Sequence, residues 1–141
     1  MEDTLINFET AKLAKEKGFD IPQNKMFSII IDRSIFNKTD NPEVIKFHNG
    51  DKHQCSNIPH DWNNTQSQTP TKYYSAPTQS LLQKWLREVH NIHITVTSIS
   101  QESWQYHIQK PKDKLGDNYN EDYENYEEAL EEALQGSLKL I

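Results

Sequence analysis

The sequence predicts an α+β fold, in which a single layer of mainly antiparallel sheet with four to five strands packs with about three helices. Two segments, 77–90 and 123–140, carry apolar residues at helical spacing. Two others, 92–97 and 104–108, alternate apolar and polar residues as an antiparallel hairpin does. The elements do not follow the strict β-α-β order of a parallel sheet. The length of 141 residues predicts one domain spanning 1–141.

The first predicted helix covers Asn7–Lys17. Asn7 is a suitable N-cap, and lysines gather in the last turn, where the helix dipole favours positive charge. Gly18 can adopt the left-handed conformation that ends a helix, and Phe19 can then fold back onto the last turn.

Strands are predicted at Lys25–Ile31 and Glu43–His48, followed by a turn at Asn49-Gly50. A short strand is predicted at Thr71–Tyr74. Residues 49–70 are polar and lack periodicity, and more than about 15 residues is long for a connection in a compact domain. We therefore expect a long polar loop or insertion there.

The next predicted helix covers Pro77–His90, with Ser75 or Ala76 as its cap and Pro77 in its first turn. Asn91 is a suitable left-handed terminator. One broad face of this helix is apolar, formed by Leu81, Leu82, Trp85, Leu86 and Val89.

A hairpin of two alternating arms follows, separated by Ser98–Ser103. Its predicted buried face holds Ile92, Ile94, Val96, Trp104, Tyr106 and Ile108. Its outward face presents His93 and His107 together with threonine and glutamine side chains, and an ordered polar strand face is a candidate binding surface. Lys110–Asp122 is predicted to be a polar connection.

The last predicted helix covers about Tyr123–Leu140 and is acidic. Its apolar stripe contains Tyr126, Leu130, Ala133, Leu134 and Leu138. Glu124, Glu127 and Glu128 load its N-terminal turn, where the dipole favours anions. Gly136 is expected to weaken this helix slightly.

Charge is unevenly distributed along the chain. The formal net charge is −6, yet residues 113–141 carry nine acidic residues and two lysines, a net of −7, and residues 1–112 carry a net of +1. Arg33 and Arg87 are the only arginines, and no basic cluster is present, so we expect no direct nonspecific nucleic-acid binding. The acidic C-terminal arm instead favours a partner with a basic surface, since complementary potentials steer association.

Composition also indicates a compartment. The longest apolar run, Ile29–Ile31, is far too short for a membrane span, and the acidic N-terminus lacks a signal-peptide pattern. Cys55 is the single cysteine and has no partner for an internal disulfide, which is typical of a reducing compartment. We therefore expect a cytoplasmic location and no membrane contact.

Four possible metal ligands, His48, His53, Cys55 and His60, fall within thirteen residues. Imidazole and thiolate groups bind zinc, but the spacing is not that of a zinc finger or ribbon, and we expect no bound metal and no cofactor.

The same segment carries the remaining candidate chemistry. Cys55 beside a histidine is a possible activated nucleophile, and Asp51 and Asp61 are possible acid–base or metal-binding carboxylates. The sequence has no nucleophile elbow and no glycine-rich phosphate loop to accompany them, so we expect no catalytic site.

Aromatic residues beside the polar loop are stronger candidates for partner contact. Trp62, Tyr73 and Tyr74 lie there, and aromatic anchors contribute disproportionately to interface energy.

Three motifs carry a family resemblance: NFETAKLAKEKGFD at 7–20, YSAPTQSLLQKWLREVHNI at 74–92, and YEEAL at 126–130 followed by LKLI at 138–141. Together they resemble a family of small uncharacterised proteins encoded by phages, prophages and mobile elements of Bacteroidetes. The resemblance implies a shared scaffold and a bacterial host cell, and it supplies no established reaction and no catalytic residues to carry over. Residues 22–72 do not match the family, so we expect this protein's specificity there.

The resemblance and the acidic arm together suggest a non-catalytic accessory protein that binds and inhibits a host protein or ribonucleoprotein. The most concrete form is an anti-CRISPR or other anti-defence inhibitor. One alternative is a metal- or thiol-dependent enzyme centred on residues 48–61, which would lose activity when Cys55 or His60 is replaced. Another is a sponge for a signalling nucleotide, which would release its ligand on denaturation.

Overall fold

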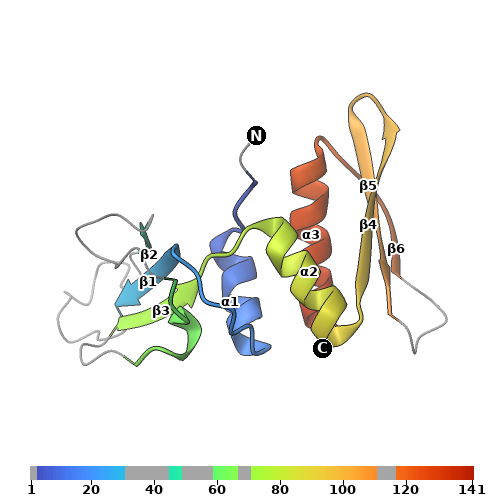
Figure 1. Ribbon diagram of the computed structural model, residues 1–141. Helices are drawn as coiled ribbons and strands as arrows, with labels where there is room; N and C mark the ends of the chain where they lie inside the picture. Colours follow the sequence, from blue (N-terminus) through green and yellow to red (C-terminus); the bar gives the residue numbers. More distant parts are fainter. Residues whose placement is uncertain (1–2, 31–44, 49–58, 67–70, 111–116) are drawn as a thin grey trace, which may run out of the picture.

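The computed structural model describes residues 3–30, 45–48, 59–66, 71–110 and 117–141. Within these residues the chain forms three α-helices and two antiparallel sheets of three strands each. The helices lie between the sheets, with β2-β1-β3 on one side and β4-β5-β6 on the other (Figure 1). The predicted α+β class is therefore confirmed. The prediction of one layer with four to five strands is wrong, because both sides of the helical layer bury apolar residues against a sheet.

The helices are α1 (Phe8–Glu16), α2 (Gln79–His90) and α3 (Tyr126–Lys139), and η2 (Trp62–Asn64) is a short 3-10 helix. The strands are β1 (Met26–Ile30), β2 (Ile45–His48), β3 (Thr71–Ser75), β4 (His93–Ser100), β5 (Ser103–Gln109) and β6 (Asp117–Tyr123). No helix among the described residues is long and apolar enough to cross a membrane.

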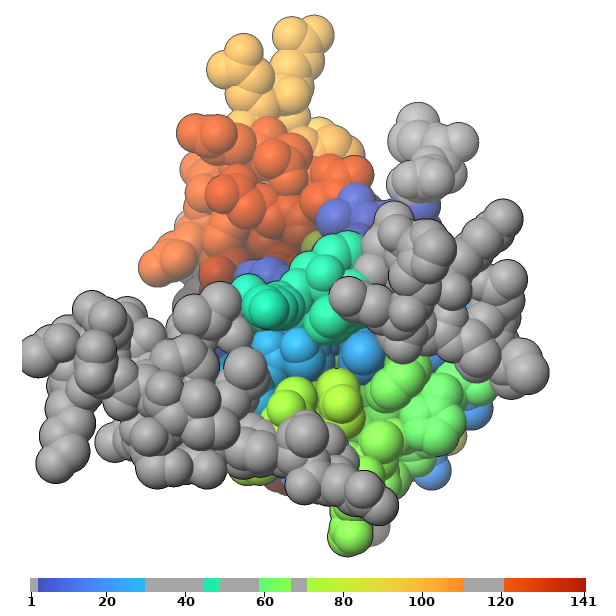
Figure 2. Space-filling view, turned by 90° about the vertical axis from the view of Figure 1, so that its left-hand side faces the viewer, coloured from blue at the N-terminus to red at the C-terminus, as the bar shows by residue number. Residues whose placement is uncertain are grey.

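The first sheet is built around β1, which pairs with β2 on one side and β3 on the other. Phe27 lies opposite both Phe47 and Tyr74, so these three side chains share one face. Phe8 of α1 covers that face, with its ring centroid 5.5 Å from that of Phe27 and 5.2 Å from that of Tyr74. Figure 2 shows this side of the molecule, where β2 (teal) and β3 (yellow-green) flank β1 (blue).

The second sheet contains the predicted hairpin. Ile94 lies opposite Ile108 and Val96 opposite Tyr106, on the face that packs against α3. The third strand, β6, pairs with β5 and occupies part of the segment predicted to be a polar connection, 110–122. That prediction is wrong for 117–122. Asn and Asp are depleted in strands, so the composition of this segment did not predict a strand. The segment nevertheless forms an edge strand, because its backbone pairs with β5.

The predicted boundaries of α1 are confirmed. The Asn7 side chain accepts a hydrogen bond from the Thr10 amide at 2.9 Å, which satisfies one of the free amides of the first turn. Gly18 has φ +89, and the Phe19 amide then donates to the Ala14 carbonyl at 3.0 Å. Phe19 is fully buried as a result.

The cap of α2 differs from the prediction. Thr78, and neither Ser75 nor Ala76, caps the helix by accepting a hydrogen bond from the Leu81 amide at 3.2 Å. Pro77 therefore lies just before the cap, and its carbonyl accepts a hydrogen bond from the amide of Ile6. At the other end Asn91 adopts the expected left-handed conformation, with φ 56 and ψ 36.

Helix α3 is the centre of the helical layer, since it contacts α1, α2 and all three strands of the second sheet. It begins at Tyr126 rather than Tyr123, because the Asn125 side chain caps it through the Glu128 amide at 2.8 Å. Glu124 therefore precedes the helix. The predicted apolar stripe is buried, except that Tyr126 is 39% exposed.

Candidate functional site

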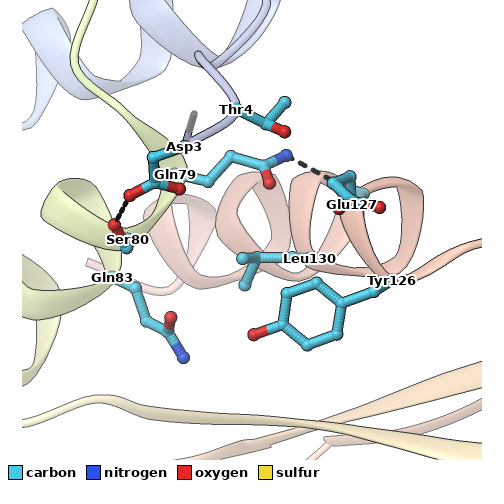
Figure 3. Close-up of a pocket in the computed structure, with 8 residues that line it drawn as sticks. All are labelled: Asp3, Thr4, Gln79, Ser80, Gln83, Tyr126, Glu127 and Leu130. Carbon is cyan, nitrogen blue, oxygen red and sulfur yellow. Dashed lines mark hydrogen bonds between the residues drawn. The ribbon is translucent and has the colours of Figure 1, made fainter. Parts of the chain in front are cut away.

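A pocket of about 340 Å³ lies where the first turns of α2 and α3 meet the segment that precedes α1 (Figure 3). This volume is within the range of about 300–1,000 Å³ that is typical of ligand sites. Its lining comes from three stretches of chain: Asp3 and Thr4 at the start, Gln79, Ser80 and Gln83 in α2, and Tyr126, Glu127 and Leu130 in α3.

Backbone pairing holds the N-terminal segment in place. The backbone N–H of Gln79 donates a hydrogen bond to the Thr4 carbonyl at 2.7 Å, and the backbone N–H of Ile6 donates one to the Pro77 carbonyl at 3.1 Å. The Ser80 hydroxyl also donates a hydrogen bond to the Asp3 carboxylate (Figure 3). These contacts fix Asp3 at the mouth of the pocket.

Gln79 is the most deeply buried polar side chain of the lining, with 2% of its surface exposed. Its amide nitrogen donates to the Glu127 carbonyl at 2.9 Å and to Glu131 Oε1 at 3.1 Å. Both partners are acceptors, so they fix which end of the amide faces the pocket. Figure 3 shows the amide oxygen turned away from Glu127, towards Leu130, and that oxygen accepts no hydrogen bond from the described residues.

Gln83 is oriented in the same way. Its amide nitrogen donates to the Ile94 carbonyl of β4 at 3.1 Å, and its oxygen accepts no hydrogen bond within the described part of the chain. The two glutamines lie one helical turn apart on α2, so their side chains line the same wall of the pocket.

The electrostatic character of the pocket follows from its lining. Asp3 and Glu127 contribute carboxylates, and the described lining residues include no lysine, arginine or histidine. Leu130 supplies an apolar surface, being 2% exposed. Tyr126 adds an aromatic ring that also meets Trp104 edge-on, with the centroids 5.7 Å apart. The pocket therefore suits a positively charged donor with some apolar surface.

The three predicted acidic contact residues lie at this end of α3. Glu124, Glu127 and Glu128 are all exposed, and Glu127 lines the pocket. Glu128 accepts a hydrogen bond from the Glu124 amide at 3.3 Å, in addition to the dipole stabilisation expected at a helix start.

The predicted aromatic contact residues divide between surface and core. Trp62 and Tyr73 are half-buried neighbours, with their centroids 5.6 Å apart, and the Trp62 indole donates to the Gln23 carbonyl at 2.8 Å. Tyr74 points to the opposite face of β3 and is only 9% exposed. We therefore correct the interpretation of Tyr74: it is a core residue, because Phe8 of α1 covers it.

Lys15 lies over the Tyr74 ring, with its Nζ 4.6 Å from the centroid, and donates to the Tyr73 carbonyl at 2.8 Å. Burial lowers the pKa of Lys15, and the nearby charge of Lys72 lowers it further. The Lys15 side chain therefore contacts other residues of the fold and is not available to a partner.

The two predicted histidines lie in the second sheet and do not line the pocket. His93 is exposed and contacts the Asn91 side chain at 3.1 Å. His107 is partly exposed and lies opposite Thr95 of β4 and Asn118 of β6.

Of the possible metal ligands, His53, Cys55 and Asp51 lie outside the described residues. The His48 ring contacts the Ser28 hydroxyl at 2.9 Å, and the His60 ring contacts Thr65 and packs against Trp62. Among the described residues no group of three or more histidine, cysteine, aspartate or glutamate side chains is arranged to hold a metal ion.

Sequence reasoning identified only Glu127 among the residues that line the pocket. One signal was available, because Gln79 and Gln83 occupy positions beside Leu82 and Leu86 on the side of α2 that faces the core. Polar residues at helical spacing within an apolar stripe indicate buried hydrogen bonding.

Comparisons with family models, curated proteins and solved structures found no match to this chain.

Proposed function

We propose that this chain is a non-catalytic binding protein that recognises a basic surface on a partner protein. The observation that carries this proposal is the acidic, acceptor-lined pocket at the start of α3, which includes Glu127, together with the exposed Glu124 and Glu128 at the same end of that helix. Opposite charges across an interface steer the encounter and set its orientation. A basic protein surface complements this end of the molecule.

The polarity of the pocket also bears on the kind of ligand. A signalling nucleotide carries phosphates, and phosphate sites use lysine, arginine or a run of backbone amides. The carboxylates of Asp3 and Glu127 would repel such a ligand. The lining therefore favours a protein-binding role over nucleotide sequestration in this pocket.

The family resemblance supports a more specific form of the proposal. A phage or mobile-element protein with an acidic face would inhibit a host defence protein, such as a CRISPR effector, by occupying a surface that handles nucleic acid. Proteins of that kind concentrate lysine and arginine on such surfaces. The exposed edge of Trp62 and Tyr73 is a second candidate contact, separate from the pocket.

The proposal is tested by capture from bacterial host lysate at low and high salt, with mass spectrometry of the recovered proteins. The test variant replaces Glu124, Glu127 and Glu128 with glutamine. The control variant replaces Glu9, Glu16 and Glu102 with glutamine. These three residues are also exposed, and their replacement changes the net charge by the same amount.

We expect at least one basic host protein to be captured by the parent and control proteins at low salt. It should be lost at high salt and reduced at least tenfold with the test variant, because several ion pairs are removed together. Equal recovery by all three proteins would contradict the proposal. So would the absence of any specifically captured protein at low salt.

A further inference from the structure

The pocket between α2 and α3 exposes hydrogen-bond acceptors. The amide nitrogens of Gln79 and Gln83 are both engaged, with Glu127 and Glu131 for the first and with Ile94 for the second. Their oxygens accept no hydrogen bond from the described residues, and both side chains line the pocket together with Asp3 and Glu127. A ligand that satisfies this wall must carry several donors and a positive charge.

The fixed orientation of the Gln79 side chain makes this more than an acidic patch. The residue is 2% exposed and its amide nitrogen is held by two acceptors of α3, while its Oε1 accepts no hydrogen bond from the described residues and points towards the pocket in Figure 3. The pocket thus presents an acceptor whose orientation is fixed before any ligand binds.

We infer that the pocket receives an arginine side chain of the partner protein. This inference rests on the proposed function, and it adds the chemical group that is recognised. A guanidinium group offers five donors in one plane, which matches acceptors spread over two helices and the N-terminal segment. Its flat faces pack on Leu130 and on the Tyr126 ring, where cation–π attraction adds to the contact.

Lysine fits the same wall less well. Its ammonium is a compact, strongly hydrated charge with three donors, so it satisfies fewer of the separated acceptors and loses more hydration on entry. The structure therefore assigns the pocket to guanidinium in preference to ammonium.

The test is a titration of the ¹⁵N-labelled protein, followed through the backbone signals of Thr4 and Glu127 and the side-chain amides of Gln79 and Gln83. The probes are the tripeptides Gly-Arg-Gly, Gly-Lys-Gly and Gly-citrulline-Gly, and free methylguanidine. Citrulline keeps the shape of arginine but lacks its charge.

Gly-Arg-Gly should shift the pocket signals, with at least tenfold weaker binding by the citrulline peptide and several-fold weaker binding by the lysine peptide. Equal binding of the citrulline or lysine peptide would overturn the assignment. Tighter binding of methylguanidine than of Gly-Arg-Gly would overturn it too, because the site would then suit a free guanidine.

Variants localise the effect. Glu127→Gln removes a carboxylate of the pocket and Gln83→Ala removes an uncharged acceptor, and each should weaken Gly-Arg-Gly binding at least fivefold. Glu132→Gln makes the same charge change on the exposed side of α3, outside the lining, and should bind as the parent does. The amide spectrum of each variant reports whether it is folded. Undiminished binding by both folded pocket variants would overturn the inference.

The outcome is separable from that of the proposed function. If the captured host protein still requires Glu124, Glu127 and Glu128 but binds Gln83→Ala undiminished, the arginine assignment fails and the proposed function stands. If Gly-Arg-Gly binds the pocket while no host protein depends on the acidic residues, the proposed function fails instead.

Discussion

Glu131 of α3 accepts a hydrogen bond from the side chain of Gln79 of α2 at 3.1 Å. The same carboxylate accepts hydrogen bonds from the Thr10 hydroxyl and from the Asn7 amide at the start of α1. A single side chain therefore ties the N-terminal turns of α1 and α2 to α3. It also holds the Gln79 amide in the orientation that directs its oxygen into the pocket.

Replacing Glu131 with alanine should lower the free energy of unfolding by about 2–3 kcal/mol, because the hydrogen bonds that Gln79, Thr10 and Asn7 donate to this charged acceptor are lost. Chemical denaturation measures this change. Glu132→Ala, at the next and exposed position, should lie within about 0.5 kcal/mol of the parent. Equal stability of the two variants would show that the Glu131 contacts contribute little.

Asn63 of η2 joins the segment that follows α1 to the end of β3. Its side chain donates to the Phe19 carbonyl at 2.8 Å and accepts from the Ser75 amide at 2.8 Å, and it is 8% exposed. Asn63→Ala should cost about 2–4 kcal/mol, since both backbone groups lose a buried partner. Thermal and urea unfolding test this, with Asn64→Ala as the exposed neighbouring control. A loss no larger than that of the control would refute the bridging role.

Asn91 tests the left-handed end of α2. Its φ of 56 is unfavourable for alanine and allowed for glycine, so Asn91→Ala should be less stable than Asn91→Gly by about 1 kcal/mol. Both variants lose the side-chain contact with His93, so their difference isolates the backbone. Urea unfolding of the two variants measures this difference in the free energy of unfolding. Equal stability of the alanine and glycine variants would contradict the prediction.

His90 predicts a pH dependence of stability. Its ring packs against Trp85 with the centroids 4.6 Å apart, and burial lowers its pKa below the ordinary value of 6.5. The unfolded chain therefore binds this proton more readily, and stability should fall as the pH is lowered through that value. Unfolding measured between about pH 7.5 and 5 should show a shallower decline for His90→Gln than for the parent. His93→Gln is the control for removing an exposed histidine, and an unchanged decline in His90→Gln would contradict the prediction.

The ends of a helix could be predicted from the sequence where the residues that cap them lie within a few positions along the chain. Asn7, Gly18 and Asn91 set the ends of α1 and α2 through contacts within a few residues. The α2 cap was displaced to Thr78 because Pro77 pairs with Ile6, which is far away in the sequence. Tyr74 was assigned to the surface because nothing in its neighbourhood shows that α1 covers that face of β3.

Gly136 illustrates the same limit. Its helical position indicates a weak point in α3, and the structure shows that a Cβ there would lie 3.2 Å from the Ile108 side chain. The absence of a side chain allows α3 to approach β5 closely. The effect of Gly136 on stability therefore depends on the packing of α3 against β5. Helix propensity, which describes single residues, gives no information about that packing.

By itself, the sequence determined the α+β class, the three helices, the hairpin with its alternating faces and the acidic character of the last helix, because periodicity, capping and charge are properties of short stretches. Only the tertiary structure decided that the strands form two sheets, that 117–123 is a strand, and that residues 3–4, 79–83 and 126–130 enclose a pocket. The physical reason is that backbone pairing and side-chain packing join segments far apart in the chain, and the orientation of the Gln79 amide is fixed only when its partners on α3 are in place.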